Sequence, residues 1–407
     1  MKVIVVGAGA SGLMAARKAA ENGNTVTVLE RNARPARKVM ITGKGRCNVT
    51  NCCDENTVIA NIPNNGRFMF SSVRAFAPSD TMDFFEQRGV ELKVERGNRV
   101  FPVSDKAVDI VDALYESCSD CRFRFNVRVK ALLTDGGRVC GVVDEKGVKY
   151  HADRVILATG GKSYPLTGST GDGYALAKSV GHTVTPIRPS LIPLEIKEKC
   201  CAELMGLTLK NVALTVTENG KTVFSEQGEM LFTHFGISGP IVLSASAHIT
   251  NPVGCAASID LKPALTHEQL DLRLRRDFEK YINKSLHNAM CDLLPQRMIP
   301  AVLDFAGLDP DERVNQLTKA QREQLCSTLK AFSLTVTGFR PIEEAIVTRG
   351  GVSVKEIDPK TMRSKLCEGL YFAGELIDVD AYTGGFNLQI AFATGAAAGR
   401  SAGERAP

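Results

Sequence analysis

The chain has 407 residues, which exceeds one ordinary domain, so we expect two or three domains. Its net charge of +5 is too small to mark a nucleic-acid-binding protein, and no apolar run approaches the roughly 20 residues that cross a membrane. The N-terminus reads as a core strand and not as a signal peptide, so we expect a cytoplasmic protein. These properties predict a small-molecule substrate, with neither a membrane nor a nucleic acid as partner.

The 12 cysteines are expected to be reduced thiols in such a protein. Cys118 and Cys121 form the only C-x-x-C pair. Without a second pair or a histidine at ligand spacing, this pair does not predict a zinc site, and we expect no metal. A redox-active pair stays open as an alternative. The adjacent pairs at 52–53 and 200–201 are interpreted as packing residues.

The first thirty residues have the pattern of a strand, a glycine turn, a helix, a second strand and an acid. An apolar run at 3–6 leads into the glycines of G-x-G-x-x-G, and a second apolar run at 25–29 ends at Glu30. This context on both sides predicts a dinucleotide site. Glu30 is placed to accept a hydrogen bond from a ribose hydroxyl, which argues against NADP.

Each glycine of this turn has an expected task. Gly7 permits the tight turn, Gly9 lets the backbone approach a diphosphate, and Gly12 lets the helix pack closely on the strand. Ala10 and Ser11 stand at the helix N-terminus, whose N–H groups and dipole favour phosphate. The turn by itself does not separate FAD from NAD.

A basic, glycine-bearing segment follows at 31–48 and is too polar for a core. We expect it to meet the cofactor or an anionic substrate, although a solvated loop is the alternative. Its candidate cofactor-binding residues are Arg31, Lys38, Gly43, Arg46, Cys47 and Asn48. Arg46 is expected to lower the pKa of the neighbouring Cys47 thiol, while a small buried residue at this position would explain the cysteine equally well.

The next elements are a helix at 106–118 and a β-meander with strands at 123–133, 139–144 and 148–151. A buried parallel strand then begins at Arg154 and runs into a glycine turn, and residues 170–173 open a helix that ends near residue 180. Four residues of this part are further candidates for contact with the cofactor: Val129, Ala158, Thr159 and Gly160.

The pattern changes near residue 190, and we predict an inserted domain over 190–340, between first-domain parts at 1–189 and 341–407. The expected strands of the insert lie at 194–196, 208–217, 222–224 and 256–261, with a turn-rich segment at 230–240. Its expected helices lie at 266–280, 284–291 and 321–331. The insert is therefore predicted to be part β and part α.

The C-terminal part returns to the first domain. A buried strand from residue 369 ends at Gly374 and Glu375, which are further candidates for contact with the cofactor. A helix rich in alanine and glycine runs from residue 384 to about 403. We expect backbone N–H groups around Gly385, Asn387 and Leu388 to stabilise negative charge on a reduced cofactor. The small residues predict close packing of this helix against the cofactor or the first strand.

Together these segments resemble the glutathione-reductase-like FAD fold, an α/β Rossmann-type domain with an inserted domain. The segment 170–173 (TGDG) is similar to one in the fumarate reductase and aspartate oxidase group. Four segments resemble the BaiN-type flavoproteins, also known as aminoacetone-oxidase-like FAD-binding enzymes: 42–51 (TGKGRCNVTN), 233–240 (THFGISGP), 348–352 (TRGGV) and 383–389 (TGGFNLQ). This resemblance covers essentially the whole chain.

The resemblance implies one FAD per chain and an insert that covers the flavin. Activities in the family include NAD(P)H-linked reduction of unsaturated 3-oxo bile-acid rings and oxidation of small amines with oxygen. We expect the reductase, with NAD(P)H as a transient co-substrate because no second G-x-G-x-x-G is present. The amine oxidase and a non-catalytic or RNA-associated flavoprotein are alternatives, and the oligomeric state is left open.

Reduction of a conjugated C=C bond needs a proton donor besides the hydride. Tyr382, just before the final helix, is the favoured catalytic acid, followed by His234 and then Tyr164.

Overall fold

The computed structural model describes residues 1–404 and divides into two compact units. Unit 1 consists of Met1–Ser190 together with the chain from Pro341 onward, and unit 2 is Leu191–Arg340. The sequence places these junctions at 189/190 and 340/341. Within the described residues, no helix is long and apolar enough to cross a membrane.

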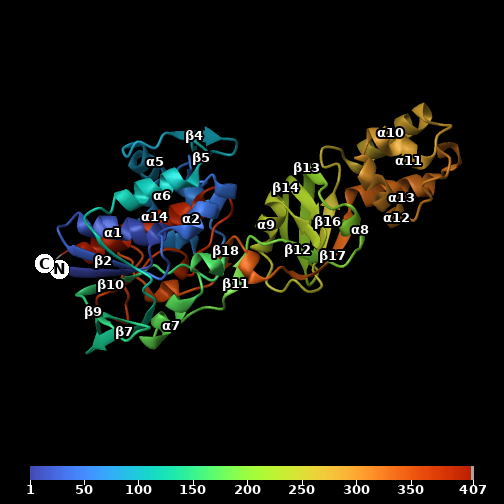
Figure 1. The fold of residues 1–407 in the computed structure, drawn as a ribbon. Coiled ribbons are helices and arrows are strands. Elements are labelled where there is room, and N and C mark those ends of the chain that lie inside the picture. The colour runs from blue at the N-terminus through green and yellow to red at the C-terminus, as the bar shows by residue number, and fades with distance from the viewer. Residues whose placement is uncertain (405–407) are drawn as a thin grey trace. The chain divides into compact units, whose positions relative to one another are not determined.

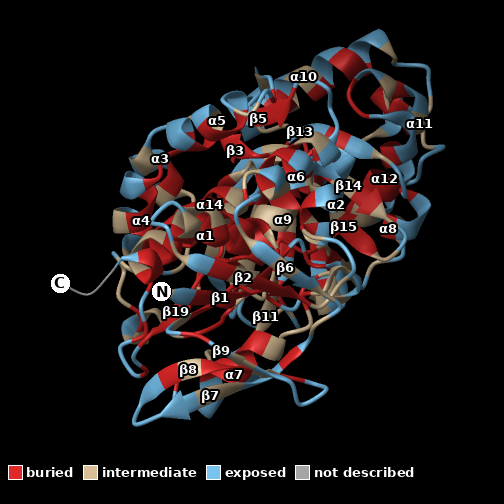
Figure 2. Cartoon of the chain, turned by 60° about the vertical axis from the view of Figure 1, so that its left-hand side comes forward, coloured by how far each residue is buried: buried red, intermediate tan, exposed pale blue. Residues whose placement is uncertain are grey.

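Unit 1 is built on a five-stranded parallel sheet whose central strands are buried on both faces. The order is β19 (Leu370–Phe372), β10 (Arg154–Leu157), β1 (Lys2–Val6), β2 (Thr25–Glu30) and β6 (Arg122–Phe125). Continuous runs of valine, isoleucine and leucine are what a parallel strand covered on both faces requires. Figure 2 shows β1 and β2 almost entirely in the colour of buried residues. The predicted α/β Rossmann-type fold is confirmed.

Helices α1 (Ala10–Ala20) and α14 (Phe386–Gly403) pack on one face of this sheet (Figure 1). A Cβ added at Gly395 would overlap the carbonyl oxygen of Ser11, and one at Gly399 would overlap that of Ala15. The small residues of α14 therefore serve close packing against α1. The sequence predicted the cofactor or the first strand as the partner, and the helix partner was missed because the spacing of small residues does not name it.

The opposite face carries the meander, a three-stranded antiparallel sheet of β7 (Val129–Asp135), β8 (Arg138–Asp144) and β9 (Lys149–His151) (Figure 1). The expected single strand over 123–133 is wrong, because it is two strands in different sheets. Asn126 between them has a φ of 58°, in the left-handed region, where the chain cannot continue as a strand. Residues up to Phe125 extend the parallel sheet, and Val129 starts the meander.

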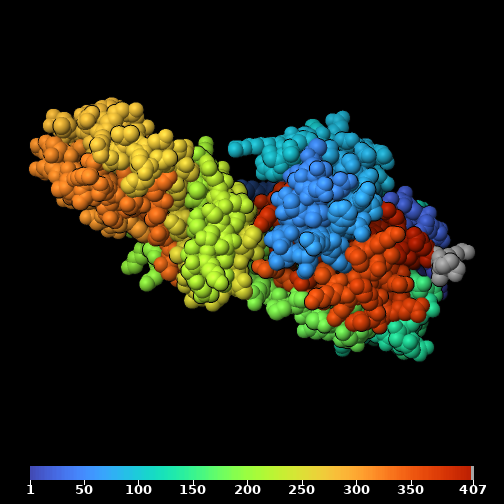
Figure 3. Space-filling model, turned by 180° about the vertical axis from the view of Figure 1, so that it is seen from behind, coloured from blue at the N-terminus to red at the C-terminus, as the bar shows by residue number. Residues whose placement is uncertain are grey.

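The remaining elements of unit 1 surround these layers. Two small sheets are β3 (Thr50–Asn51), β5 (Arg99–Pro102) and β4 (Leu92–Glu95), and β11 (Arg188–Ser190) with β18 (Val347–Arg349). The helices are α2 (Arg37–Ile41), α3 (Glu55–Ala60), α4 (Phe70–Ala75), α5 (Pro78–Glu86), α6 (Ala107–Glu116) and α7 (Asp172–Ser179). Figure 3 shows the returning C-terminal part of unit 1 in red beside blue residues from its first part.

Unit 2 contains a closed six-stranded barrel. In barrel order its strands are β12 (Leu194–Ile196), β15 (Gly236–Ser238), β14 (Lys221–Thr233), β13 (Thr208–Glu218), β16 (Ala256–Asp260) and β17 (Phe332–Phe339). Its helices are α8 (Cys200–Glu203), α9 (Pro240–Ser246), α10 (His267–Lys280), α11 (Leu286–Ala289), α12 (Ile299–Ala306) and α13 (Lys319–Lys330). The unit has its own hydrophobic core.

Two expectations about unit 2 need correction. The segment 230–240 is not turn-rich, because β14 continues through it to Thr233 with Met230 and Phe232 buried. Strand β17 was not predicted, although Phe332, Leu334 and Val336 alternate with exposed residues. Strand β14 pairs with its chain neighbours β13 and β15. Strand β17 pairs with the distant strands β12 and β16 around the barrel, and local patterns do not record that pairing.

Candidate functional site

A cavity opens in unit 1 at the carboxyl ends of β1, β2 and β10, the edge at which ligands bind in open α/β sheets. Its lining includes the three chain segments that follow these strands, at 7–11, 30–32 and 158–160. The empty space is about 1340 Å³, part of which is open to solvent. The cavity therefore lies where the fingerprint turn meets the adjacent loops.

The glycines of this turn serve two purposes: Gly7 and Gly12 permit close packing of the backbone, and Gly9 leaves room for a ligand. Gly7 has a φ of 103°, and a Cβ there would lie 2.5 Å from the carbonyl oxygen of Ala158. A Cβ at Gly12 would overlap the carbonyl oxygen of Gly7, so this glycine lets α1 lie against the turn. A Cβ at Gly9 would meet no atom within 4 Å. Gly9 thus borders open space at the N-terminus of α1, which no side chain caps.

The Glu30 carboxylate is almost completely held by the chain itself. The backbone N–H of Ala8 donates to its Oε2 at 2.8 Å, and Asn32 donates to its Oε1 from the backbone at 2.8 Å and from Nδ2 at 2.7 Å. A carboxylate accepts about four hydrogen bonds. One acceptor position is left on Oε2 in the cavity wall, which suits a single ribose hydroxyl.

A charged cluster borders the cavity beside Glu30. Arg128 donates to both carboxylate oxygens of Asp172, at 2.8 Å and 2.9 Å, and Arg31 donates to Asp172 at 3.1 Å and also to Thr170. The hydrogen bond from Arg128 is the main reason why the pKa of Asp172 is lowered. The cluster ties β2, β7 and the start of α7 together at this wall.

A second polar cluster joins Lys38 to Glu375. Lys38 Nζ donates to Glu375 Oε2 at 2.6 Å and to Ser163 Oγ at 2.7 Å, and Ser163 Oγ donates to Glu375 Oε1 at 3.0 Å. The backbone N–H of Thr348 also donates to Glu375 Oε1, at 2.8 Å. Burial alone would raise the pKa of Glu375, but Lys38 and these hydrogen bonds outweigh it, and the pKa is lowered.

The start of α14 forms the apolar end of the cavity. Leu388, Ile390 and Ala391 line it together with Val379 and residues 346–347. Asn387 Oδ1 accepts from the backbone N–H of Ala381 at 2.9 Å, and its Nδ2 donates to the carbonyl oxygen of Ala381 at 2.7 Å. The Asn387 side chain is therefore occupied in fixing the preceding loop, while no side chain caps the helix N-terminus.

The structure brings fourteen of the candidate cofactor residues to this cavity: Gly7, Gly9, Ala10, Ser11, Glu30, Arg31, Lys38, Val129, Ala158, Thr159, Gly160, Glu375, Asn387 and Leu388. It does not bring seven others to the lining: Gly12, Gly43, Arg46, Cys47, Asn48, Gly374 and Gly385. With the side-chain amide turned so that both of its polar atoms have partners, the Asn48 oxygen accepts from the backbone N–H of Gly385 at 2.9 Å. Asn48 therefore holds the residue that precedes α14.

The expectations for Arg46 and Cys47 need correction. Arg46 donates from Nε to Asp105 at 2.8 Å and forms an ion pair with Glu95, so its charge is already balanced away from the cavity. Cys47 is fully buried, and burial raises the pKa of its thiol to about 12. Desolvation of the thiolate outweighs the neighbouring charge, because the Arg46 guanidinium points at carboxylates and not at the sulfur.

The three candidate proton donors have different surroundings. The backbone N–H of Tyr382 donates to Asn61 O at 3.0 Å, and Asn387 reaches the carbonyl oxygen of Tyr382 at 3.3 Å, which ties this residue to the cavity wall. Tyr164 is half-buried next to Ser163, and burial raises the pKa of its hydroxyl. His234 belongs to unit 2, where it is exposed and packs edge-on against Phe235.

Sequence reasoning missed part of the lining. Arg128 and Asp172 lie in segments that were singled out, yet their pairing across 44 residues was not foreseeable from local pattern. The apolar residues of the wall had no signal beyond ordinary hydrophobic periodicity. Among the missed lining residues are Val39, Val127, Leu176, Ile346, Val347, Val379 and Ile390.

These features fit an FAD molecule. The open space at Gly9 and the uncapped start of α1 suit a diphosphate, the remaining acceptor of Glu30 suits a ribose hydroxyl, and the apolar end at α14 suits a flat ring system. When bound, FAD would supply two-electron chemistry that the side chains of the cavity lack.

Comparison with known proteins agrees with this assignment. Residues 1–401 match the family model described as the HI0933-like protein Rossmann domain. The chain is 33% identical to a 3-dehydro-bile acid delta(4,6)-reductase of Clostridium scindens over 99% of both chains. It is 32% identical to a ribosomal RNA dihydrouridine synthase of Escherichia coli, covering 96% of this chain and 95% of that one.

Among solved structures, 3-ketosteroid delta1-dehydrogenase from Sterolibacterium denitrificans has a TM-score of 0.53 at 13% identity, with 98% of this chain and 99% of that chain covered. At this identity the likeness concerns the fold alone. The resemblance to BaiN-type flavoproteins is confirmed by the family match and the full-length relatives. The chain therefore belongs to the HI0933-like family of FAD-binding Rossmann proteins and is a flavoprotein oxidoreductase.

Proposed function

We propose that the protein is an FAD-dependent, NAD(P)H-linked reductase of a C=C bond conjugated with a carbonyl group. The carrying observation is that two relatives of nearly equal identity are named for such reductions on unlike molecules. A 3-dehydro bile acid with a delta(4,6) system has its double bonds conjugated with the 3-oxo group. Dihydrouridine is uridine whose C5=C6 bond, conjugated with the C4 carbonyl, has been reduced. The bond type is thus the shared element.

The reaction adds one hydride and one proton across the C=C bond, and NAD(P)H becomes NAD(P)⁺. FAD at this site would relay the hydride between the two substrates. The backbone N–H groups at the start of α14 would stabilise negative charge next to the apolar end of the cavity. Tyr382, held next to this wall through Asn387, is the proposed proton donor, and His234 is the second candidate.

An unsaturated 3-oxo steroid or bile acid is the proposed substrate class. The end of the cavity at Val379, Leu388 and Ile390 is apolar, as binding of a fused hydrocarbon ring system requires. Charge supports the same choice, because residues 191–340 carry 16 lysines and arginines against 17 aspartates and glutamates. An inserted domain that bound RNA would be expected to carry an excess of positive charge.

A uracil base in ribosomal RNA is the second candidate substrate, and it is favoured by the two rRNA dihydrouridine synthases among the relatives. This candidate differs from the expectation that no nucleic acid is a partner. The alternative of an oxygen-using amine oxidase follows from the family resemblance. The three functions differ in their acceptors, so one set of assays separates them.

The test begins with purified protein reconstituted with FAD and titrated anaerobically with NADH and with NADPH. Rapid bleaching of the flavin followed by reoxidation with a 4,6-diene-3-oxo bile acid supports the proposal. Reoxidation by an rRNA transcript, with dihydrouridine detected by mass spectrometry, would show that the substrate is RNA and not a steroid. Flavin that is reduced by aminoacetone and yields hydrogen peroxide under air, but is not reduced by either nicotinamide, would refute a reductase.

A further inference from the structure

Cys118 and Cys121 form a thiol pair beside helix α1, and neither residue lines the cavity. The backbone N–H of Cys121 donates to the carbonyl oxygen of Cys118 at 2.9 Å, which closes a tight turn. Residues i and i+3 of such a turn have α-carbons within roughly 7 Å, and a disulfide spans roughly 4.4–6.8 Å between α-carbons. The backbone therefore already holds the two cysteines at bridging range.

Both sulfurs contact α1. Cys118 Sγ donates to the carbonyl oxygen of Leu13 at 3.3 Å, and Cys121 Sγ donates to that of Ala16 at 3.6 Å. Cys118 is 1% exposed, whereas Cys121 is partly exposed, so Cys121 is the residue of the pair that is nearer to solvent.

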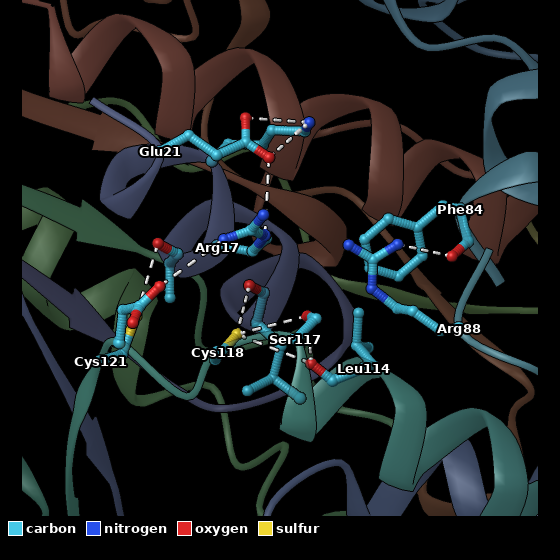
Figure 4. A network of polar contacts seen from close by, with 12 residues as sticks. Arg17, Glu21, Phe84, Arg88, Leu114, Ser117, Cys118 and Cys121 are labelled. Atoms are coloured by element: carbon cyan, nitrogen blue, oxygen red, sulfur yellow. Dashed lines mark hydrogen bonds and ion pairs between the residues drawn. The ribbon is translucent and has the colours of Figure 1, made fainter. Parts of the chain in front are cut away.

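The surroundings shift the pKa values of the two thiols in opposite directions. The neighbouring Cys121 thiol, Ser117 and the positive charge of Arg17 lower the pKa of Cys118, although burial opposes them. The neighbouring Cys118 thiol and burial raise the pKa of Cys121. Figure 4 shows Arg17 between Glu21 and the turn that carries the two cysteines. Cys118 is therefore the thiol of the pair that loses its proton first.

We propose that Cys118 and Cys121 are a reversible oxidation site that forms an intramolecular disulfide with hydrogen peroxide. The Cys118 thiolate takes the proton of Cys121, and the Cys121 thiolate then attacks one peroxide oxygen, which breaks the O–O bond and releases hydroxide. The Cys118 sulfur then attacks the resulting sulfenic acid and forms the S–S bond as the second oxygen leaves. In sum, two thiols and one peroxide give one disulfide and two waters, and a dithiol reductant reverses the step.

The adjacent cysteines of the chain provide an internal contrast. Cys201 is buried while its neighbour Cys200 is partly exposed, as in the first pair. Neighbouring α-carbons lie about 3.8 Å apart, which is below the range that a relaxed disulfide spans. The two cysteine pairs have similar burial, so we expect backbone geometry to favour a disulfide at 118/121 and to disfavour one at 200/201.

Peptide mapping of the full-length FAD-loaded protein tests this proposal. Reduced protein is treated with a series of hydrogen peroxide concentrations, alkylated with N-ethylmaleimide and digested with trypsin. Cleavage after Lys106 and Arg122 isolates residues 107–122, which contain only these two cysteines, and cleavage after Lys199 and Lys210 isolates residues 200–210 as the control. We expect the first peptide to lose both alkylation sites and two hydrogen masses, and dithiothreitol to restore both sites.

The control peptide is expected to keep both alkylated thiols at the same peroxide concentrations. The variants Cys118→Ala and Cys121→Ala should each abolish the loss of two hydrogen masses, and their thermal unfolding reports whether they are folded. Retention of both alkylated thiols in peptide 107–122 would overturn the proposal, and so would equal loss in both peptides. Oxidation to sulfinic acid without the loss of two hydrogens would overturn it as well.

Discussion

The substitution Gly9→Ala tests the cofactor site without disturbing the fold. Gly9 has a φ of −81° and a ψ of −173°, which alanine adopts freely, and its added Cβ would meet no protein atom within 4 Å. We therefore expect the free energy of unfolding of the FAD-free protein to change by less than about 0.5 kcal/mol. The methyl group would project into the space assigned to the diphosphate.

The expected loss of FAD affinity follows from that overlap. Inserting a methyl group into a filled space costs about 1–3 kcal/mol, which corresponds to roughly 5-fold to 150-fold weaker binding. Binding is measured by quenching of FAD fluorescence on titration with FAD-free protein, and stability by thermal unfolding of the same preparation. Neither measurement depends on knowing the substrate.

Gly12→Ala is the matched control, because it adds the same methyl group three residues later in the same turn. Its Cβ would overlap the carbonyl oxygen of Gly7, so this variant should be destabilised even without FAD. Wild-type FAD affinity in Gly9→Ala would refute the assignment of the diphosphate to this turn. Equal destabilisation of the two FAD-free variants would refute the assignment of Gly12 to helix packing and of Gly9 to ligand binding.

Three further substitutions probe buried charge in unit 1, each by denaturation across pH. Lys38→Met should cost about 2 kcal/mol at pH 8, because Glu375 loses its cation; the cost should shrink as pH falls below about 4, where the carboxyl is protonated. His182 has its pKa lowered mainly by burial, so wild-type stability should fall as pH drops below about 6.5, and His182→Gln should flatten this acid limb. Burial raises the pKa of Asp380, so its contribution is lost as pH rises above the unfolded-state pKa of about 4, and Asp380→Asn should be more stable relative to wild type at pH 8 than below about pH 4. Identical pH profiles for variant and wild type would contradict the argument at that residue.

The fingerprint could be predicted because its chemistry is local. Gly7, Gly9, Gly12 and Glu30 lie within one strand–helix–strand segment, and the spacing alone determines which backbone groups meet at the strand end. The buried apolar runs at 3–6, 25–29 and from residue 154 also predict parallel strands, although they do not give the order of these strands in the sheet. What the sequence cannot supply is which side chains pair across that edge, because such pairs join segments far apart in the chain.

Lys38 and Glu375 illustrate this limit. Both were predicted to contact the cofactor, and both line the cavity, yet their mutual ion pair spans 337 residues and was not foreseen. Arg46 shows the opposite error, because a basic residue in a glycine-rich loop suggested an anion site while Glu95 and Asp105 already balance its charge. Whether a charged residue is free for a ligand depends on partners that local pattern does not reveal.

Helix α1 connects the features of unit 1 that bear on function. Its N-terminus borders the cavity at Gly9, and α14 approaches its backbone so closely that Gly395 and Gly399 admit no side chain. Cys118 and Cys121 donate to carbonyl oxygens on the same helix. Because close-packed interiors transmit strain, we expect a change at any of these contacts to be felt at the helix N-terminus beside the cavity. The alanine- and glycine-rich composition of α1 and α14 is thus a requirement of the cofactor site as well as of the core.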